Sequence, residues 1–127
     1  MNLTLQVLAD RLAIYRLSPG EPVPERPEGA LFWSVTCTNE ETSVVLPEGN
    51  VPAQWVAERG WRCLKVVGPL DFDLTGILAS LVVPLAEAEV SIFAVSTYNT
   101  DYILLREKDL EKARRVLTRN GHSVRDP

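Results

Sequence analysis

Histidine and cysteine are scarce in this chain, which has one histidine, His122, and two cysteines, Cys37 and Cys63, among 127 residues. A catalytic pair built on histidine would have to use His122, which we expect to be exposed or to cap an element near the C-terminus. Neither cysteine has a histidine, an aspartate or another cysteine at the short spacing that zinc sites use. We therefore predict no metal, no cofactor and no catalysis. Two cysteines can form a disulfide, but in a cytosolic chain we expect both to be buried free thiols.

Long apolar runs and a surplus of positive charge are missing as well. Lysine and arginine total 13 against 17 aspartates and glutamates, and the net charge of −4 disfavours nucleic acid as a partner. No apolar run has the length of a membrane span, and the first residues lack the basic and apolar regions of a signal peptide. We expect a cytoplasmic protein with no membrane partner, built as one ordinary domain or two very small ones.

The first half of the chain shows the alternation of β-strands. Residues 3–8 and 12–17 predict two strands that pair with each other, and residues 31–38 and 43–47 predict two more. Four prolines lie in the stretch between these pairs, which predicts a surface loop. Residues 52–58 predict a short helical turn. A mostly β unit over residues 1–60 follows from this pattern.

The second half, residues 61–127, alternates strands and helices. The predicted elements are a strand at 61–67, a helix that begins at 71–76, a hairpin over 90–106, a helix at 107–120 and a strand at 123–124. This βαββαβ order is that of a ferredoxin-like unit. The fold class is therefore α+β: a ferredoxin-like unit preceded by a shortened, mostly β unit.

Caps and a proline set the limits of the two predicted helices. Asp71 or Asp73 caps the first helix, and Pro84 is expected to kink it or to end its regular hydrogen bonding. Gly121 is expected to cap the second helix, because glycine adopts the left-handed conformation that often ends helices.

The connection between the two strands of the hairpin is unusually polar. It holds six side chains that can form hydrogen bonds, more than a tight turn requires: Ser96, Thr97, Tyr98, Asn99, Thr100 and Asp101. This surplus is the first indication of a ligand site.

Two stretches of the second half resemble the ACT-domain family, and in particular its small bacterial members related to the animal arginine sensors. They are the Pro-Leu-Asp-Phe-Asp-Leu-Thr-Gly run at residues 69–76 and the Ser-Thr-Tyr-Asn-Thr-Asp-Tyr run at residues 96–102. The first half resembles a shortened ACT-like partner unit. The resemblance implies a regulatory or sensor protein that binds an amino acid at an interface between ACT units and has no catalysis of its own. It also implies a homodimer.

The resemblance and the chemistry of the residues together give a candidate site. The resemblance carries ligand contacts to Gly76, Ser91, Ile92, Thr97, Tyr98 and Asp101. Residue chemistry adds backbone N–H groups at the start of the helix and one more hydroxyl, from Leu74, Thr75, Ile77 and Thr100. Helix N–H groups suit the ligand's carboxylate, and Asp101 suits an ammonium or a basic side chain.

Each of these residues also has a purely structural interpretation. Asp101 can cap the hairpin through a bond to its own backbone, and Gly76 can let the helix pack tightly on the sheet. On that interpretation the protein is a structural dimerisation module whose pocket is vestigial.

Overall fold

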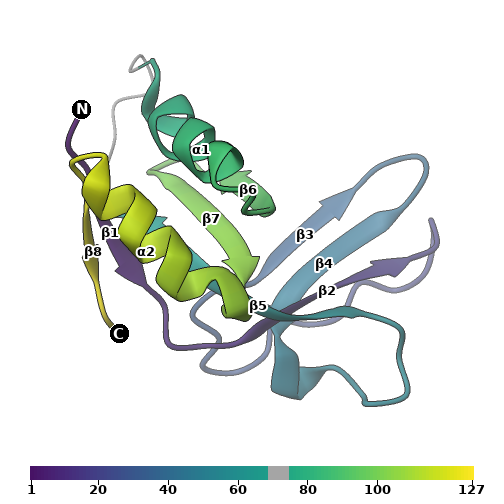
Figure 1. Ribbon diagram of the computed structural model, residues 1–127. Coiled ribbons are helices and arrows are strands. Elements are labelled where there is room, and N and C mark those ends of the chain that lie inside the picture. The colour runs from purple at the N-terminus through teal and green to yellow at the C-terminus, as the bar shows by residue number, and fades with distance from the viewer. Residues whose placement is uncertain (69–74) are drawn as a thin grey trace. The chain divides into compact units, whose positions relative to one another are not determined.

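The computed structural model describes residues 1–68 and 75–127, which form two compact units (Figure 1). Unit 1 comprises Met1–Leu8 and Arg62–Pro127, and unit 2 comprises Ala9–Trp61. Strand β5 (Glu58–Val66) runs from one unit into the other. The expected domain limit at residues 60–61 therefore lies within a strand, and the first eight residues group with the C-terminal part of the chain.

Unit 1 has the βαββαβ order that the sequence predicts. Its elements are β1 (Thr4–Val7), the end of β5, α1 (Ile77–Glu87), β6 (Ile92–Ser96), β7 (Asp101–Arg106), α2 (Leu110–Arg119) and β8 (Ser123–Arg125). The strands lie side by side in the order β8-β1-β5-β7-β6. From β5 onward this confirms the ferredoxin-like sequence of elements.

Strand β1 does not pair with the strand that the sequence predicted as its partner. The expected hairpin of residues 3–8 with residues 12–17 does not form, because β1 lies between β5 and β8 instead. It is antiparallel to β5, with Leu5 opposite Val66, and parallel to β8. Leu5 and Val7 are fully buried in the core of unit 1, and this burial favours the observed pairing over an exposed local hairpin.

The core of unit 1 lies between the sheet and the two helices. Alternate strand residues contribute to it, as expected when one face of a sheet is covered. Its fully buried members are Leu5, Val7, Leu64, Val66, Leu81, Leu85, Ile103, Leu105, Ala113 and Leu117. This arrangement fixes the ends of the strands, where the candidate site lies.

The sequence predicted that Pro84 would kink α1 or end its regular hydrogen bonding, and the helix continues through Pro84 to Glu87. A proline has no N–H to donate to the carbonyl four residues earlier, which here belongs to Ser80. His122 Nε2 lies 3.2 Å from that carbonyl oxygen, and the Leu3 N–H donates to His122 Nδ1 at 3.1 Å. His122 is 4% exposed, so it is not the exposed residue that one reading of the sequence expected: its ring supplies the bond that Pro84 withholds.

The end of α2 follows the prediction. Gly121 has a φ of 92°, and the His122 N–H donates to the Leu117 carbonyl at 3.0 Å, as in a glycine-terminated helix. A 3₁₀ turn at Glu107–Asp109 leads into the helix, so α2 proper begins at Leu110.

Unit 2 is all β apart from one 3₁₀ turn at Glu48–Asn50. Its strands β2 (Leu12–Leu17), β3 (Ser34–Cys37) and β4 (Thr42–Pro47) and the start of β5 lie in the order β3-β4-β2-β5. A small core of Ala13, Tyr15, Val44, Leu46 and Val51 holds them together. The helical turn expected at residues 52–58 is absent, because the chain there makes a single turn in which the Trp55 N–H donates to the Pro52 carbonyl.

Two further observations bear on the sequence predictions. Both cysteines are free thiols, and Cys63 is buried as expected, whereas Cys37 is exposed, contrary to the expectation. Neither helix in the described part of the chain is long enough and apolar enough to cross a membrane.

Candidate functional site

The polar connection of the hairpin is a four-residue turn that its own hydrogen bonds close. Strands β6 and β7 pair from Ile92 opposite Leu105 to Ser96 opposite Asp101. The Thr97 N–H donates to the Thr100 carbonyl at 2.8 Å, and the Thr97 hydroxyl donates to the same oxygen at 3.0 Å. The Thr97 side chain is therefore already engaged in holding the turn.

Thr100 fastens this turn to the neighbouring strand. Its hydroxyl donates to the Val66 carbonyl at 2.6 Å, and the residue is 4% exposed. Because Val66 is the last residue of β5, the bond fixes the tip of the hairpin beside the end of that strand. Thr100 thus positions the site.

Asp101 is half-buried at the start of β7, and its Oδ1 accepts a 2.6 Å hydrogen bond from the Ser96 hydroxyl. This bond crosses between the two strands, so the carboxylate is oriented by a neighbouring side chain. Its second oxygen forms no hydrogen bond or ion pair within the described residues. Tyr98, at the tip of the turn, is much more exposed than Asp101, with 81% of its surface accessible to solvent.

The start of α1 carries the next group of predicted residues. Gly76 is the N-cap, with a φ of 79° and no side-chain cap bond, and Thr75 is exposed while Ile77 is buried. No described atom lies within 4 Å of the place that a Gly76 Cβ would take, so its positive φ explains the glycine better than tight packing does. As in any α-helix, the first N–H groups of α1 have no intrahelical partners. Leu74 and the expected caps Asp71 and Asp73 lie outside the described residues.

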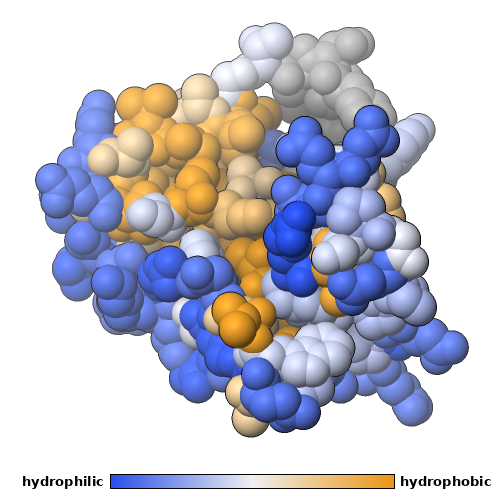
Figure 2. Space-filling model, turned by 90° about the vertical axis from the view of Figure 1, so that its right-hand side faces the viewer, coloured by the Kyte–Doolittle hydropathy of each residue, from blue (hydrophilic) through white to orange (hydrophobic). Residues whose placement is uncertain are grey.

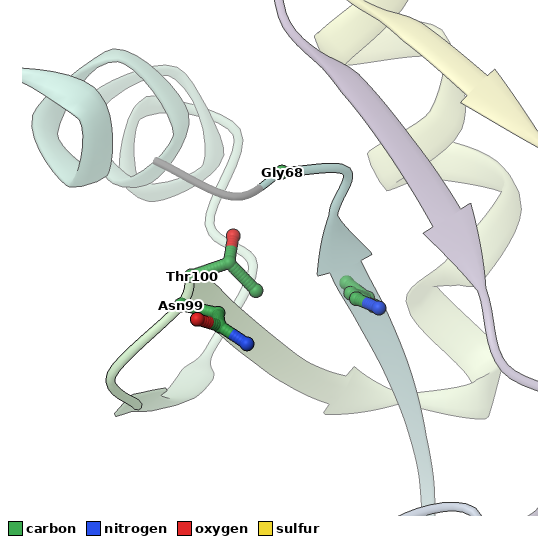
Figure 3. Close-up of a pocket in the computed structure, with 4 residues that line it drawn as sticks. Gly68, Asn99 and Thr100 are labelled. Atoms are coloured by element: carbon green, nitrogen blue, oxygen red, sulfur yellow. The ribbon is translucent and has the colours of Figure 1, made fainter. Parts of the chain in front are cut away.

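A shallow pocket of about 170 Å³ lies beside the hairpin tip, lined by Lys65, Gly68, Asn99 and Thr100. Figure 3 shows Asn99 and Thr100 at the start of β7, beside the segment in which Gly68 follows the end of β5. Lys65 makes no ion pair within the part of the chain that the structure describes. Lys65 is not among the residues predicted from the sequence, although a lysine in the otherwise apolar run from Cys63 to Val67 could have indicated it.

Ser91 and Ile92 lie at the opposite end of the hairpin. Ser91 is exposed just before β6, and Ile92 pairs with Leu105, five residues along the strand from the tip. At about 3.3 Å per residue, roughly 17 Å separates Ser91 from the Ser96–Asp101 pair. That is longer than an extended arginine, so one unit does not bring these two groups of residues around one amino acid.

Burial favours the protonated form of two ionisable groups in the sheet of unit 1, Cys63 and Tyr102. Burial raises the pKa of the Cys63 thiol to about 12. Burial, with a smaller contribution from Cys63, also raises the pKa of Tyr102. Neither group is an effective nucleophile or base near neutral pH.

Comparisons with known proteins agree with one another on the family. The family model described as ACT domain matches residues 56–119. A crystal structure of a protein from Agobacterium tumefaciens superimposes with a TM-score of 0.92 at 37% identity, covering 100% of this chain and 95% of the other. The regulatory subunit of aspartate kinase from Thermus thermophilus shares the fold, with a TM-score of 0.62 at 10% identity over 91% of this chain and 95% of that one.

A curated relative comes from cattle. The protein named cytosolic arginine sensor for mTORC1 subunit 1, from Bos taurus, is 36% identical over 106 residues, which are 75% of this chain and 32% of the sensor. The chain therefore spans about a third of the length of that relative.

Proposed function

The chain belongs to the ACT-domain family, and on that premise we propose that it is a non-catalytic regulatory protein that senses an amino acid. One observation carries the proposal: the hairpin tip, the end of β5 and the pocket with Lys65 meet at one place, with a carboxylate on Asp101 close by. The bovine relative is named a cytosolic sensor of arginine, which supports both the class of ligand and a cytoplasmic location.

The chemistry of this place matches the two charged groups of an α-amino acid. The Lys65 ammonium in the pocket suits a carboxylate, and so do the N–H groups at the start of a helix such as α1. The Asp101 carboxylate, oriented by Ser96, suits an ammonium or a guanidinium. Tyr98 is exposed at the tip and can cover a bound ligand.

A homodimer completes the proposed site. The pocket of about 170 Å³ is smaller than the 300 Å³ or more that ligand sites commonly have, so a second surface must close it. Ser91 and Ile92 of a partner chain supply that surface in our proposal, because they lie too far from the tip of their own chain.

Two surfaces of unit 1 suit a partner chain. Within the described residues β6 pairs only with β7, which leaves one backbone edge of β6 unpaired. Helix α1 is apolar on nearly all sides, although only Ile77, Leu81 and Leu85 are buried, and Val83 is 52% exposed. Apolar side chains gather in the upper part of the face in Figure 2, at the height of α1 in Figure 1. Helices of this kind are usually covered.

The proposal is tested by calorimetric titration of the protein with each of the twenty amino acids. We expect one or a few amino acids to bind, and Asp101→Ala to abolish that binding while the dimer persists in analytical ultracentrifugation. Ser96→Ala is the matched control, because it removes the bond that orients Asp101 but keeps the carboxylate, so binding weakens only moderately. Absence of binding at millimolar concentration of every amino acid would contradict the proposal.

A second candidate function is a structural dimerisation module. The engaged hydroxyls of Thr97 and Thr100 favour it, because both hold the hairpin without any ligand. This alternative predicts a stable dimer that no amino acid stabilises and that Asp101→Ala leaves unchanged.

A further inference from the structure

A second pocket lies wholly within unit 2, with no residue in common with the hairpin site. Its volume is about 330 Å³, at the lower end of the range for small-molecule sites. It is lined by Tyr15, Arg16, Leu17, Glu21, Trp55 and Val56. The first three end strand β2, Glu21 belongs to the proline-rich loop, and Trp55 and Val56 follow the turn at Pro52.

The aromatic wall of this pocket is held by a ring contact and by hydrogen bonds to its loop, although it faces solvent. Trp55 is 44% exposed and meets Tyr15 edge to face, with 5.4 Å between the ring centroids. The Arg59 guanidinium donates to the carbonyls of Pro52 and Trp55 at 2.9 and 3.1 Å, and this fixes the loop that carries the indole. Val56 beside it is 97% exposed. A fixed, exposed aromatic and aliphatic surface costs hydration free energy unless something covers it.

Two opposite charges line the same pocket without pairing with each other. Arg16 donates to the Glu40 carbonyl at 3.0 Å, and Glu21 accepts from the Ser18 N–H at 3.0 Å. Within the described residues neither side chain forms an ion pair. Arg16 therefore keeps further N–H donors, and Glu21 keeps a carboxylate oxygen, for a molecule that lies between them.

From this combination we infer that unit 2 carries a second binding site, for a zwitterionic α-amino acid with a large apolar side chain. The carboxylate of the ligand pairs with Arg16 and its ammonium with Glu21. Its side chain lies against Trp55, Leu17 and Val56. This site goes beyond the proposed function, because it uses other residues, lies in the other unit and selects an amino acid with an apolar side chain.

The experiment uses the full chain and follows tryptophan fluorescence during titration with L-leucine. Binding places an apolar side chain on the exposed indole of Trp55 and shifts its emission, whereas Trp61 is already 6% exposed. N-acetyl-L-leucine lacks the ammonium and L-leucinamide lacks the carboxylate, and we expect each to bind roughly tenfold or more weakly than leucine. Trp55→Ala should abolish the shift.

Variants assign each charge to its partner. In Glu21→Gln the preference for leucine over N-acetyl-leucine should disappear, and in Arg16→Gln the preference for leucine over leucinamide should disappear. Glu28→Gln changes an exposed glutamate of the same loop outside the pocket and should leave both preferences intact. Asp101→Ala should leave leucine binding unchanged.

Three results would overturn this inference. The first is that leucine causes no shift in tryptophan emission at millimolar concentration. The second is that the two blocked analogues bind as well as leucine. The third is that Asp101→Ala removes the leucine signal. In the third case the signal comes from the hairpin site, so the proposed function stands while the second site falls. Loss of all binding at the hairpin site with leucine binding retained would instead contradict the proposed function and support the second site.

Discussion

A proline in the middle of α1 is tolerated because a distant histidine bonds to the carbonyl that the proline leaves without a partner. His122 Nε2 lies 3.2 Å from the Ser80 oxygen, in a site where His122 is 4% exposed. If this is the role of His122, Pro84→Ala makes it partly redundant, because an alanine N–H can donate to Ser80 within the helix. The two residues should therefore be coupled energetically.

The matched change at the histidine is His122→Asn. Asparagine keeps an acceptor close to the backbone, where Nδ1 receives the Leu3 N–H, but it does not reach Ser80. A buried hydrogen bond contributes about 1 kcal/mol net. We expect His122→Asn to lower the free energy of unfolding by about 1 kcal/mol more in the parent protein than in Pro84→Ala. Pro84→Ala alone should raise the free energy of unfolding, since alanine favours the helix interior.

Urea denaturation of the four proteins, followed by far-UV circular dichroism at one protein concentration, measures this coupling. His122→Ala serves as the harsher control, because it leaves both the Leu3 N–H and the Ser80 carbonyl without partners and should cost about 2–4 kcal/mol. An equal effect of His122→Asn with and without Pro84 would refute the reasoning. So would a lower stability of Pro84→Ala, because the proline would then be favourable in the helix.

Four further predictions test other parts of the structure. Thr100→Val leaves the buried Val66 carbonyl without its donor and should lower the free energy of unfolding by about 1–3 kcal/mol, whereas Thr100→Ser should cost clearly less; urea titration of both compares them. Gly76→Ala forces a side chain into a backbone with a φ of 79° and should cost about 1–2 kcal/mol by the same measurement, and a cost near zero would mean that the helix starts differently. Because burial raises the pKa of Cys63 to about 12, only Cys37 should react with a thiol reagent in the native protein at neutral pH. The unfolded chain loses the Cys63 proton near pH 9, while the folded chain keeps it up to about pH 12. Between these pH values the free energy of unfolding should therefore fall by about 1.4 kcal/mol per pH unit because of Cys63. Cys63→Ala should remove that part of the pH dependence.

The elements with strong local patterns were predictable from the sequence. Strand β2 has its predicted limits, and the hairpin and α2 follow because alternation and helical spacing are local properties. The pairing of β1 was not predictable in this way, since only burial in a core assembled from residues far apart in the chain selects its neighbours. The role of His122 was missed for the same reason, because its partners Leu3 and Ser80 are distant in sequence.

The residues of the candidate site also differ in whether the sequence alone could predict them. The polar tip and Gly76 could be identified from residue types and resemblance, while Lys65 emerged only when β5 was placed beside the turn. Residue types also do not reveal that the hydroxyls of Thr97 and Thr100 are engaged in holding the hairpin, because that depends on the geometry of the turn.

The central claim, an amino-acid site shared between two chains, is tested most directly by mixing two inactive variants. Asp101→Ala removes the tip contact, and Ser91→Trp blocks the strand contact, so neither homodimer should bind the amino acid that the parent protein binds. A symmetric dimer pairs the tip of one chain with the strand of the other, so an equimolar mixture after subunit exchange should regain about a quarter of the parent's sites in a calorimetric titration. If the mixture binds no more than its separate components, while the parent binds, the site is not shared between chains.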